Sequence, residues 1–231
     1  MASNLAVKVP PQFAPLFEQA QQYVETYFKS KKFLPEKGTI EIGGERYILV
    51  RAASMSVHFL EFITAMYPSL DKVEAVEAAS IVLFDMAHSI GMADAKNFHE
   101  ALKVTDPIAK LSTGPIHFSF TGWAHVDIAA ESIPAPDENY KLIYDHPNSF
   151  EADSWIHQGK TTSFCTCFMN SGYSAGWCQE SFGIPLISRE ILCRAKGDPF
   201  CRFVMAQRHK LDHFIHEYKN QNPLLFRSSA A

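Results

Sequence analysis

The sequence predicts an α+β fold in which helices and antiparallel strands are mixed and the C-terminal half is rich in strands. Apolar residues recur at helical spacing in several segments of the first hundred residues. Short alternating segments flank glycine turns, as in β-hairpins. Helices and strands do not follow one another in the regular βαβα order of a parallel sheet. A last hairpin followed by a terminal helix is expected to close the fold.

Composition excludes several classes of protein. The chain has 231 residues and is 47% hydrophobic, which is typical of one large globular domain or two small ones. The net charge is −4, and no basic run interleaved with aromatics is present, so we expect no direct contact with nucleic acid. No secretory pattern and no apolar run of about 18 residues occur, which predicts a cytoplasmic protein without a membrane segment. Five cysteines, an odd number, indicate reduced thiols rather than disulfides.

The N-terminal half reads as helices around one hairpin. Residues 11–30 form an amphipathic pattern, and residues 39–50 read as a hairpin whose Gly43-Gly44 can adopt a primed turn. Residues 55–66 have helical spacing. A longer helix is expected to begin near Ser69 and to break at Gly91, with a shorter helical piece up to about residue 104. The expected buried stripe of the long helix is Val73, Val76, Leu83, Phe84, Ala87 and Ile90.

In the C-terminal half, the expected helices and strands alternate more often. We expect a strand over 116–128, a strand pair over 140–146 and 149–157, and a helix over 168–183 in which Gly172 and Gly176 permit close packing. A second hairpin over 187–195 and 200–206 precedes an amphipathic helix over 207–219. The expected division is an N-terminal helical and hairpin part (1–135), a part that carries the second hairpin (136–206), and a linker helix with a tail (207–231).

The last hairpin offers metal ligands. Cys193 and Cys201 lie symmetrically about Gly197, so a turn there places both thiols on one face, at a separation that two thiolates on one zinc ion require. Glu190 can supply a carboxylate ligand if a bulge turns it to the same face. Spacing alone does not choose the fourth ligand, for which Cys165, Cys167 and Cys178 are candidates.

Other polar clusters have simpler interpretations. His209, His213 and His216 share one side of the terminal helix, but its apolar stripe lies elsewhere, so a solvated face is expected. No Gly-x-Ser-x-Gly elbow and no glycine-rich phosphate loop occur. The carboxylates of Asp145, Glu151 and Asp153 are expected at strand ends. The sequence therefore predicts that the chain is not an enzyme.

Three motifs carry a resemblance to a known family. These are Asn148-Ser-Phe-Glu-Ala152, Ser171-Gly-Tyr-Ser-Ala-Gly176 and Glu190-x2-Cys193-x7-Cys201. With Gly114-Pro115 and Gly122-Trp123 upstream, the similarity covers most of residues 35–206. The chain resembles the aromatic-sensing N-terminal region of bacterial phenol- and xylene-responsive activators, which ends in a 4-vinyl reductase type domain.

The resemblance implies a structural zinc site. In that family one Glu and three Cys bind the ion, and the first Cys stands 26 residues before the second, which corresponds to Cys167 here. The implied ligands are Cys167, Glu190, Cys193 and Cys201.

The resemblance also implies a buried pocket for a small hydrophobic or aromatic effector. The residues available for it are Phe118, Phe120, Tyr144, His146, Tyr173 and Trp177. The phenol sensors carry Trp at the position of His146 and a His near the segment that here holds His117 and Phe118. We therefore do not carry phenol itself over as the effector.

The function expected from these features is a ligand-sensing domain. The terminal helix would pass the signal to an output module, either in the same longer chain or in a separate partner, and the domain would form a homodimer through that helix. One alternative is an enzyme or accessory protein of the 4-vinyl reductase type that acts on a tetrapyrrole. Another is a haem-type gas sensor, for which His88 or His99 would be the axial ligand.

Overall fold

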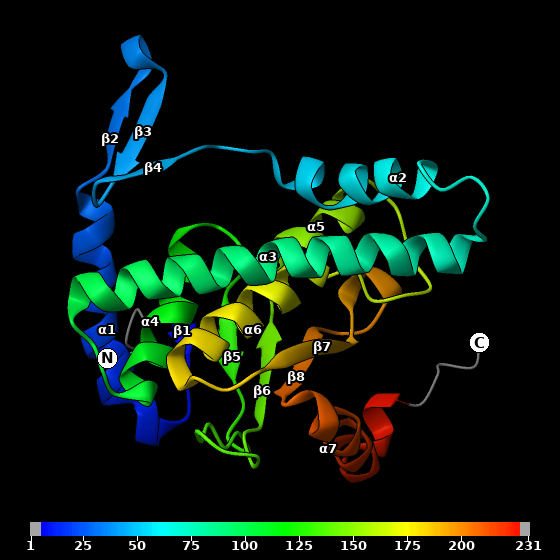
Figure 1. The fold of residues 1–231 in the computed structure, drawn as a ribbon. Helices are drawn as coiled ribbons and strands as arrows, with labels where there is room; N and C mark the ends of the chain where they lie inside the picture. Colours follow the sequence, from blue (N-terminus) through cyan, green and yellow to red (C-terminus); the bar gives the residue numbers. More distant parts are fainter. Residues whose placement is uncertain (1–5, 227–231) are drawn as a thin grey trace.

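The computed structural model describes residues 6–226 and confirms the predicted mixture of helices and mostly antiparallel strands (Figure 1). The helices are α1 (Ala14–Lys29), α2 (Val57–Ala65), α3 (Lys72–Leu102), α4 (Pro107–Phe120), α5 (Phe150–His157), α6 (Phe168–Phe182) and α7 (Arg208–Gln221). The strands are β1 (Val7–Lys8), β2 (Lys32–Leu34), β3 (Thr39–Ile42), β4 (Glu45–Tyr47), β5 (Val126–Ile128), β6 (Leu142–His146), β7 (Ile187–Leu192) and β8 (Cys201–Ala206).

A five-stranded sheet forms the centre of the body, in the order β1-β5-β6-β8-β7. Only β1 and β5 run parallel; the other neighbours are antiparallel. Alternate residues of β6 and β8 face opposite sides, as strand geometry requires. Tyr144 and Phe203 join the main core with α6, whereas Ile143 and Val204 pack against α7 on the other side. The sheet therefore separates α6 from α7.

The second sheet is an arm that projects from the body (Figure 1). Strands β2, β3 and β4 form it, and Gly43 and Gly44 make the predicted tight turn with φ of +60° and +90°. A Cβ on Gly43 would lie 1.9 Å from the Tyr27 ring, so only glycine lets the turn rest on α1. The chain returns from the arm to the body through residues 48–51.

Helix α3 is longer than the sequence predicted. Asp71 caps it, in a capping box with Glu74, and the helix runs unbroken through Gly91 to Leu102. The predicted break and the separate short helix are therefore wrong. A Cβ on Gly91 would lie 2.3 Å from the carbonyl oxygen of Tyr173, so this glycine serves close packing against α6.

The buried face of α3 consists largely of small residues. It comprises Ala75, Ala79, Leu83, Ala87, Gly91, Ala95, Phe98 and His99. Leu83 and Ala87 belong to the predicted stripe, but Val73 is 67% exposed and Ile90 is exposed as well. The predicted stripe is therefore wrong at these two positions, because the close approach of α6 selects small side chains for the contact. By length and mean hydropathy (1.3), α3 is the one described helix that could cross a membrane.

Residues 116–120, predicted as part of a strand, lie in helix α4 instead. Asp106 caps this helix by accepting from the Ala109 amide, and Pro107 occupies its first position, where no backbone donor is needed. Of the predicted strand, Val126–Ile128 form β5, and Ala124 makes an isolated bridge with Ser149.

The predicted strand over 149–157 is also wrong, because these residues form helix α5. Ser149 caps it through the Ala152 amide, and Glu151 and Asp153 stand in its first turn, where carboxylates favour a helix N-terminus.

Helices α6 and α7 and the last hairpin are confirmed. On α6, a Cβ on Gly172 or Gly176 would lie 2.2 or 2.1 Å from a backbone oxygen of α3, so both glycines permit the predicted close packing. Leu211, Ile215 and Tyr218 bury one face of α7. His209, His213 and His216 are exposed on that helix, as expected.

Candidate functional site

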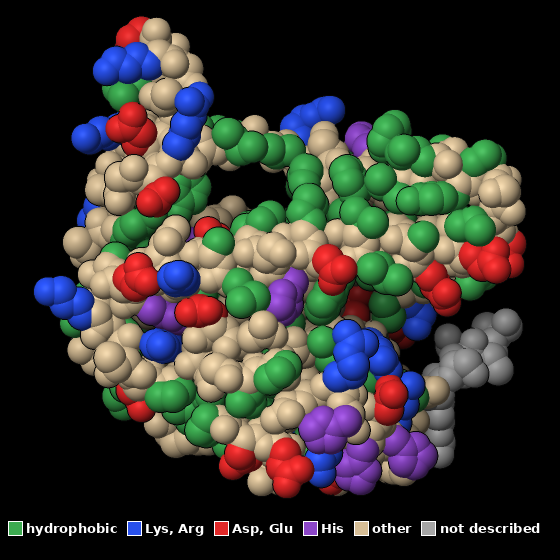
Figure 2. All heavy atoms as spheres, in the orientation of Figure 1, with side chains coloured by type: hydrophobic (Ala, Val, Ile, Leu, Met, Phe, Trp, Pro, Cys, Tyr) green, Lys and Arg blue, Asp and Glu red, His purple; other side chains and the backbone are tan. Residues whose placement is uncertain are grey.

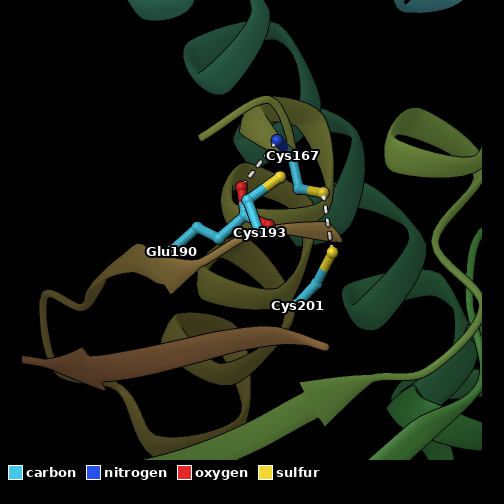
Figure 3. A group of neighbouring side chains, drawn as sticks. All are labelled: Cys167, Glu190, Cys193 and Cys201. Atoms are coloured by element: carbon cyan, nitrogen blue, oxygen red, sulfur yellow. Dashed lines mark hydrogen bonds between the residues drawn. The ribbon is translucent and has the colours of Figure 1, made fainter. Parts of the chain in front are cut away.

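Four predicted metal ligands meet in one buried cluster (Figure 3). Their ligand atoms all lie within 4.8 Å of one another. Cys167 stands directly before α6, Glu190 lies on β7, Cys193 follows β7, and Cys201 begins β8. Among the three cysteines that spacing left open, the structure places Cys167 in the cluster and leaves Cys165 and Cys178 outside it.

The turn of Glu190 toward the thiols comes from an irregularity in β7. The pairing register between β7 and β8 shifts between Glu190 and Leu192. Such a bulge re-aims the side chain, as the sequence required. Without it, Glu190 would face the opposite side of the strand from Cys193.

The donor set suits a thiophilic divalent cation. Cys167 Sγ and Cys201 Sγ are 3.8 Å apart, which agrees with two ligands on a tetrahedral zinc ion with Zn–S bonds of about 2.3 Å. Glu190 Oε2 accepts from the Cys167 amide at 2.9 Å, whereas Oε1 is buried without a hydrogen-bond partner. Burial raises the pKa of Glu190 and of Cys167 well above their ordinary values, because their charged forms are desolvated. A bound cation would remove this penalty.

A groove of about 880 Å³ leads to this cluster between α3, the outer edge of β7 and the start of α7. Cys165, Cys167 and Glu190 are among its lining residues. The cluster is therefore buried beneath an open groove.

A small apolar cavity lies between α4, α6 and the sheet. Its volume is about 30 Å³. Aromatic side chains from three elements line it: Phe118 from α4, Tyr144 from β6, and Tyr173 and Trp177 from α6. The Tyr144 hydroxyl lies 2.7 Å from Ser188 Oγ, which supplies a polar group at this wall.

Two of the predicted pocket residues do not line the cavity. His146 lies behind it, with its ring centroid 5.4 Å from Phe118 and 5.2 Å from Tyr144, and neither ring nitrogen has a partner. Burial lowers the pKa of His146 to about 3, so the ring is neutral. Phe120 is 38% exposed and packs on Phe28 of α1. Side chains two positions apart on a helix point to different sides, which explains why Phe120 does not line the cavity with Phe118.

Eight lining residues were not predicted from the sequence: Leu111, Gly114, Pro115, Val126, Ile128, Leu142, Ser174 and Cys178. Two of them, Ser174 and Cys178, lie on α6. Each follows a predicted pocket residue directly on α6. Residues at i, i+1, i+4 and i+5 of a helix form one stripe, so the spacing of Tyr173 and Trp177 was a sufficient signal for both.

A hydrogen-bonded chain leads from the cavity to α3. The Tyr173 hydroxyl donates to Asp94 Oδ2 at 2.9 Å and lies 3.1 Å from His117 Nδ1. Because the hydroxyl has a single hydrogen, His117 Nδ1 carries the proton that points back to Tyr173. Burial raises the pKa of Asp94 and lowers that of His117 to about 3.

The two histidines considered for haem lie outside the cavity lining. His88 stacks on Phe84, and His99 Nε2 is 3.3 Å from the Lys110 carbonyl oxygen. A cavity of about 30 Å³ also offers no room for a porphyrin.

The part of the chain that the structure describes thus contains an aromatic-lined cavity and a buried cluster of three cysteines and one glutamate. Residues 29–133 match the family model described as "Activator of aromatic catabolism". The resemblance predicted from the sequence is thereby confirmed.

A solved sensory domain has the same fold. The phenol-responsive sensory domain of the transcription activator PoxR with phenol has a TM-score of 0.68 and 21% identity, covering 86% of this chain and 96% of that chain.

Two further structures are less similar. A trafficking protein particle complex subunit 3 from Naegleria fowleri, covalently bound to palmitic acid, has a TM-score of 0.46 and 12% identity, covering 67% and 93%. A vinyl-4-reductase family protein from Methanocaldococcus jannaschii has a TM-score of 0.41 and 16% identity, covering 89% and 97%. No curated protein sequence matches the chain significantly.

Proposed function

We propose that this chain is a cytoplasmic sensory domain, not an enzyme, which binds a small hydrophobic or aromatic effector and controls a transcriptional output module. The aromatic-lined cavity between α4, α6 and the sheet carries this proposal. Apolar walls with a few converging polar groups are typical of small-molecule sites. The fold is that of a phenol-responsive sensory domain, which supports the same class of ligand.

The size of the cavity supports a sensor that changes shape. A cavity of about 150 Å³ accommodates benzene, whereas the one between α4 and α6 measures about 30 Å³. An aromatic effector therefore requires Phe118, Tyr173 or Trp177 to move. The effector then binds one arrangement of the domain better than the other, which is the condition for a ligand to shift an equilibrium.

A matched pair of variants on α4 tests the pocket. Calorimetry with phenol, alkylphenols and alkylbenzenes is expected to identify a binding compound. Phe118→Ala is expected to change its affinity by more than about tenfold, since Phe118 lines the cavity, whereas Phe120→Ala on the surface leaves it unchanged. Equal effects of both substitutions, or no binding by any compound, would refute the assignment.

We further propose that the four-residue cluster holds a structural zinc ion. When bound, zinc supplies no chemistry beyond four bonds that join the start of α6 to the β7–β8 hairpin. Cys167, Cys193 and Cys201 would act as thiolates and Glu190 as a carboxylate.

Native mass spectrometry tests the zinc proposal. One zinc ion per chain is expected, and it should be lost with unfolding in Cys193→Ser. The control Cys165→Ser alters a partly buried thiol outside the cluster and should retain the metal. A folded, metal-free Cys193→Ser protein would contradict a structural role.

The homodimer is proposed to form on the arm and the outer face of α2 and α3, and not through α7. The apolar stripe of α7 already packs against the sheet of its own chain. In contrast, Ile48, Leu49 and Val50 are 75%, 84% and 49% exposed where the chain leaves the arm. Figure 2 shows an opening between this connection and the helices below it, bordered by hydrophobic atoms.

Further exposed apolar residues continue this surface. They are Phe62 of α2, Met66 directly after α2, and Val73, Ile81, Val82 and Ile90 of α3. Single exposed apolar residues are ordinary, but patches above a few hundred Å² usually mark an interface. A second copy is the favoured occupant, because the projecting arm and the neighbouring apolar face are present on both copies and can engage reciprocally.

Size-exclusion chromatography with light scattering tests this dimer. Leu49→Asp is expected to shift the protein to monomer, since it places a charge in the interface. Leu224→Asp alters an apolar residue of similar exposure (74%) elsewhere and should leave the dimer intact. A wild-type monomer at micromolar concentration, or a dimeric Leu49→Asp variant, would refute this surface.

The output would follow from the three parts of the chain. We propose that residues 1–135 form the N-terminal helical and hairpin part of the sensor and that 136–206 form its ligand- and zinc-binding part. Residues 207–231 would connect them to an output module in the same longer chain or in a separate partner. Arg202 pairs with Asp145 and donates to the Tyr218 hydroxyl, so α7 is tied to the sheet that forms one wall of the cavity.

A further inference from the structure

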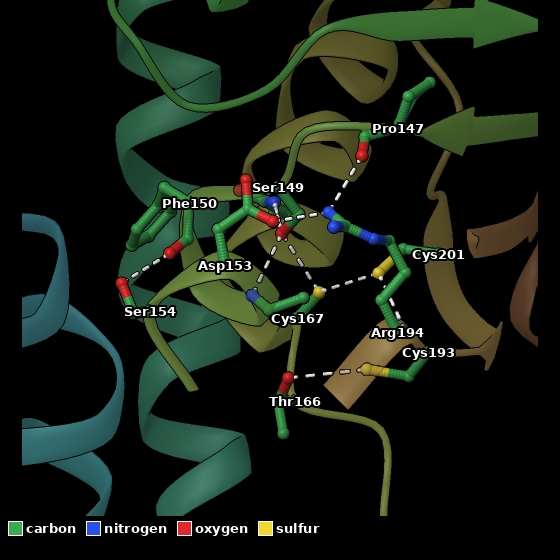
Figure 4. Close-up of polar contacts among 12 residues, drawn as sticks. Pro147, Ser149, Phe150, Asp153, Ser154, Thr166, Cys167, Cys193, Arg194 and Cys201 are labelled. Carbon is green, nitrogen blue, oxygen red and sulfur yellow. Dashed lines mark hydrogen bonds and ion pairs between the residues drawn. The ribbon is translucent and has the colours of Figure 1, made fainter. Parts of the chain in front are cut away.

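The segment Asn148–Ala152 carries part of the family resemblance but has no role in the metal cluster or cavity described above. It connects β6 to α5, and two of its polar side chains, Ser149 and Glu151, are completely buried. Ser149 lies against the sulfur of Cys167, directly before α6 (Figure 4). Glu151 accepts from the Met169 amide in the first turn of α6.

The hydrogen bonds of Ser149 determine where its single hydrogen points. Asn170 Nδ2 donates to Ser149 Oγ at 2.7 Å, and the Ala152 amide donates to it at 3.4 Å. A hydroxyl has two acceptor lone pairs and one donor hydrogen. With both lone pairs occupied, the hydrogen is directed to the remaining neighbour, Cys167 Sγ, at 3.1 Å. Ser149 is therefore the donor and the sulfur is the acceptor.

Glu151 holds the adjacent backbone. Its carboxylate accepts from the Met169 amide at 3.0 Å and from the Asn170 amide at 2.8 Å. Cys167 makes no side-chain cap at the start of α6, so Glu151 satisfies these first-turn donors from another helix. Asn170 connects the two residues, since its backbone amide donates to Glu151 and its side-chain amide donates to Ser149.

The other two sulfurs each have a donor as well. Thr166 Oγ1 lies 3.4 Å from Cys193 Sγ, and the Arg194 amide donates to Cys201 Sγ at 3.4 Å. Donors around a ligand atom orient it and stabilise its anionic form. Ser149 differs from these two donors because it comes from outside the loop and hairpin that carry the ligands.

We infer that Ser149 is a positioning residue of the metal site, which donates a hydrogen bond to the Cys167 sulfur and fixes its direction, with Glu151 and Asn170 holding both partners in place. This inference rests on the proposed zinc site. It assigns the Asn148–Ala152 segment to the outer layer of that site and links the site to β6, whose Tyr144 lines the cavity.

The test measures metal retention and the electronic state of the sulfur. Loss of a contact in the outer layer of a metal site typically weakens metal binding by about 10- to 100-fold. Ser149→Ala is expected to lose zinc to a competing chelator in that range. In the cobalt-substituted protein it is expected to shift the sulfur-to-cobalt absorption, which a purely structural role would leave unchanged.

Ser154→Ala is the matched control. It removes another buried hydroxyl from α5, which donates to the Phe150 carbonyl and touches no ligand (Figure 4). This variant should keep the wild-type affinity and absorption. Should Ser149→Ala fail to fold even with zinc, Ser149→Thr is measured instead, because it keeps the hydroxyl. Zinc retention equal to the wild type then supports the inference. A folded Ser149→Thr protein that retains zinc less well overturns it.

The outcomes separate the two proposals. A wild-type protein that binds no metal refutes the zinc site itself. A wild-type protein that binds zinc, together with a folded Ser149→Ala variant of equal affinity and unshifted cobalt absorption, overturns only the role of Ser149.

Discussion

Gly176 stands where α6 crosses α3, and the structure predicts what a methyl group would do there. A Cβ at this position would lie 2.1 Å from the carbonyl oxygen of His88 and 2.9 Å from its carbon. Non-bonded carbon atoms are most favourably placed about 3.5–4.0 Å apart. Since the obstructing atoms belong to the backbone of α3 and cannot rotate away, the two helices must separate by about 1 Å or more.

Two opposing effects determine how much Gly176→Ala changes the free energy of unfolding. Alanine favours a helix over glycine by about 1 kcal/mol, whereas overpacking a well-packed interface costs about 1–3 kcal/mol and occasionally more. Because the clash is with main-chain atoms, we expect the upper end of that range and a net loss of about 2 kcal/mol. For a chain of this size, this corresponds to a fall in Tm of roughly 4–8 °C.

Thermal unfolding followed by circular dichroism checks this prediction, with Ser89→Ala as the control. Ser89 is an exposed residue of α3, and its substitution should change stability by less than about 0.5 kcal/mol. Effector affinity should fall with Gly176→Ala as well, because neighbouring Trp177 lines the cavity. A Gly176→Ala protein as stable as the wild type would show that α3 and α6 do not approach this closely.

Three further outcomes are expected. The folded pKa of His117, about 3, lies below its unfolded value of 6.5, so its contribution to stability is complete above pH 6.5 and declines as pH falls, by up to about 1.4 kcal/mol per pH unit. The free energy of unfolding, measured with urea between pH 7 and 4, should therefore depend less steeply on pH in His117→Gln than in the wild type. An unchanged pH dependence would contradict this. Tyr218→Phe, which removes the acceptor for Arg202, should cost about 1 kcal/mol in the same assay, while the exposed Tyr23→Phe costs less; equal costs would argue against the bond. Removing the ion with a chelator should lower Tm by more than about 10 °C, and an unchanged Tm would exclude a structural metal.

The cluster of three cysteines and one glutamate could be predicted largely from the sequence, because most of its residues are close together along the chain. The Cys193–Cys201 hairpin has a turn at Gly197, and the bulge required for Glu190 is present. Spacing alone could not choose Cys167, since that ligand comes from a different part of the fold. The family resemblance was needed to select it.

Two helices were predicted as strands for a physical reason. Phe118 and Phe120 alternate with polar residues, which is the strand period, but Asp106 and Pro107 upstream are strong helix-start signals. Ser149 followed by Glu151 is a start signal of the same kind. In both cases the residues at the helix start were more informative than a short alternation.

The length of α3 could not be predicted, because it depends on a tertiary contact. Gly91 weakens an isolated helix, but here it faces a backbone atom of Tyr173. The partner that makes glycine favourable lies more than 80 positions further along the chain. No local pattern contains that information.

The glycine contacts between α3 and α6 also restrict how a signal can travel. Because the two helices contact each other backbone to backbone, they cannot slide or rotate past one another without steric clashes, so they move as one rigid unit. An effector that displaces Tyr173 or Trp177 would therefore tilt α3 and α6 together. Since α3 is about 46 Å long at 1.5 Å per residue, a small tilt at its middle becomes a larger displacement at its two ends, far from the place where the push began.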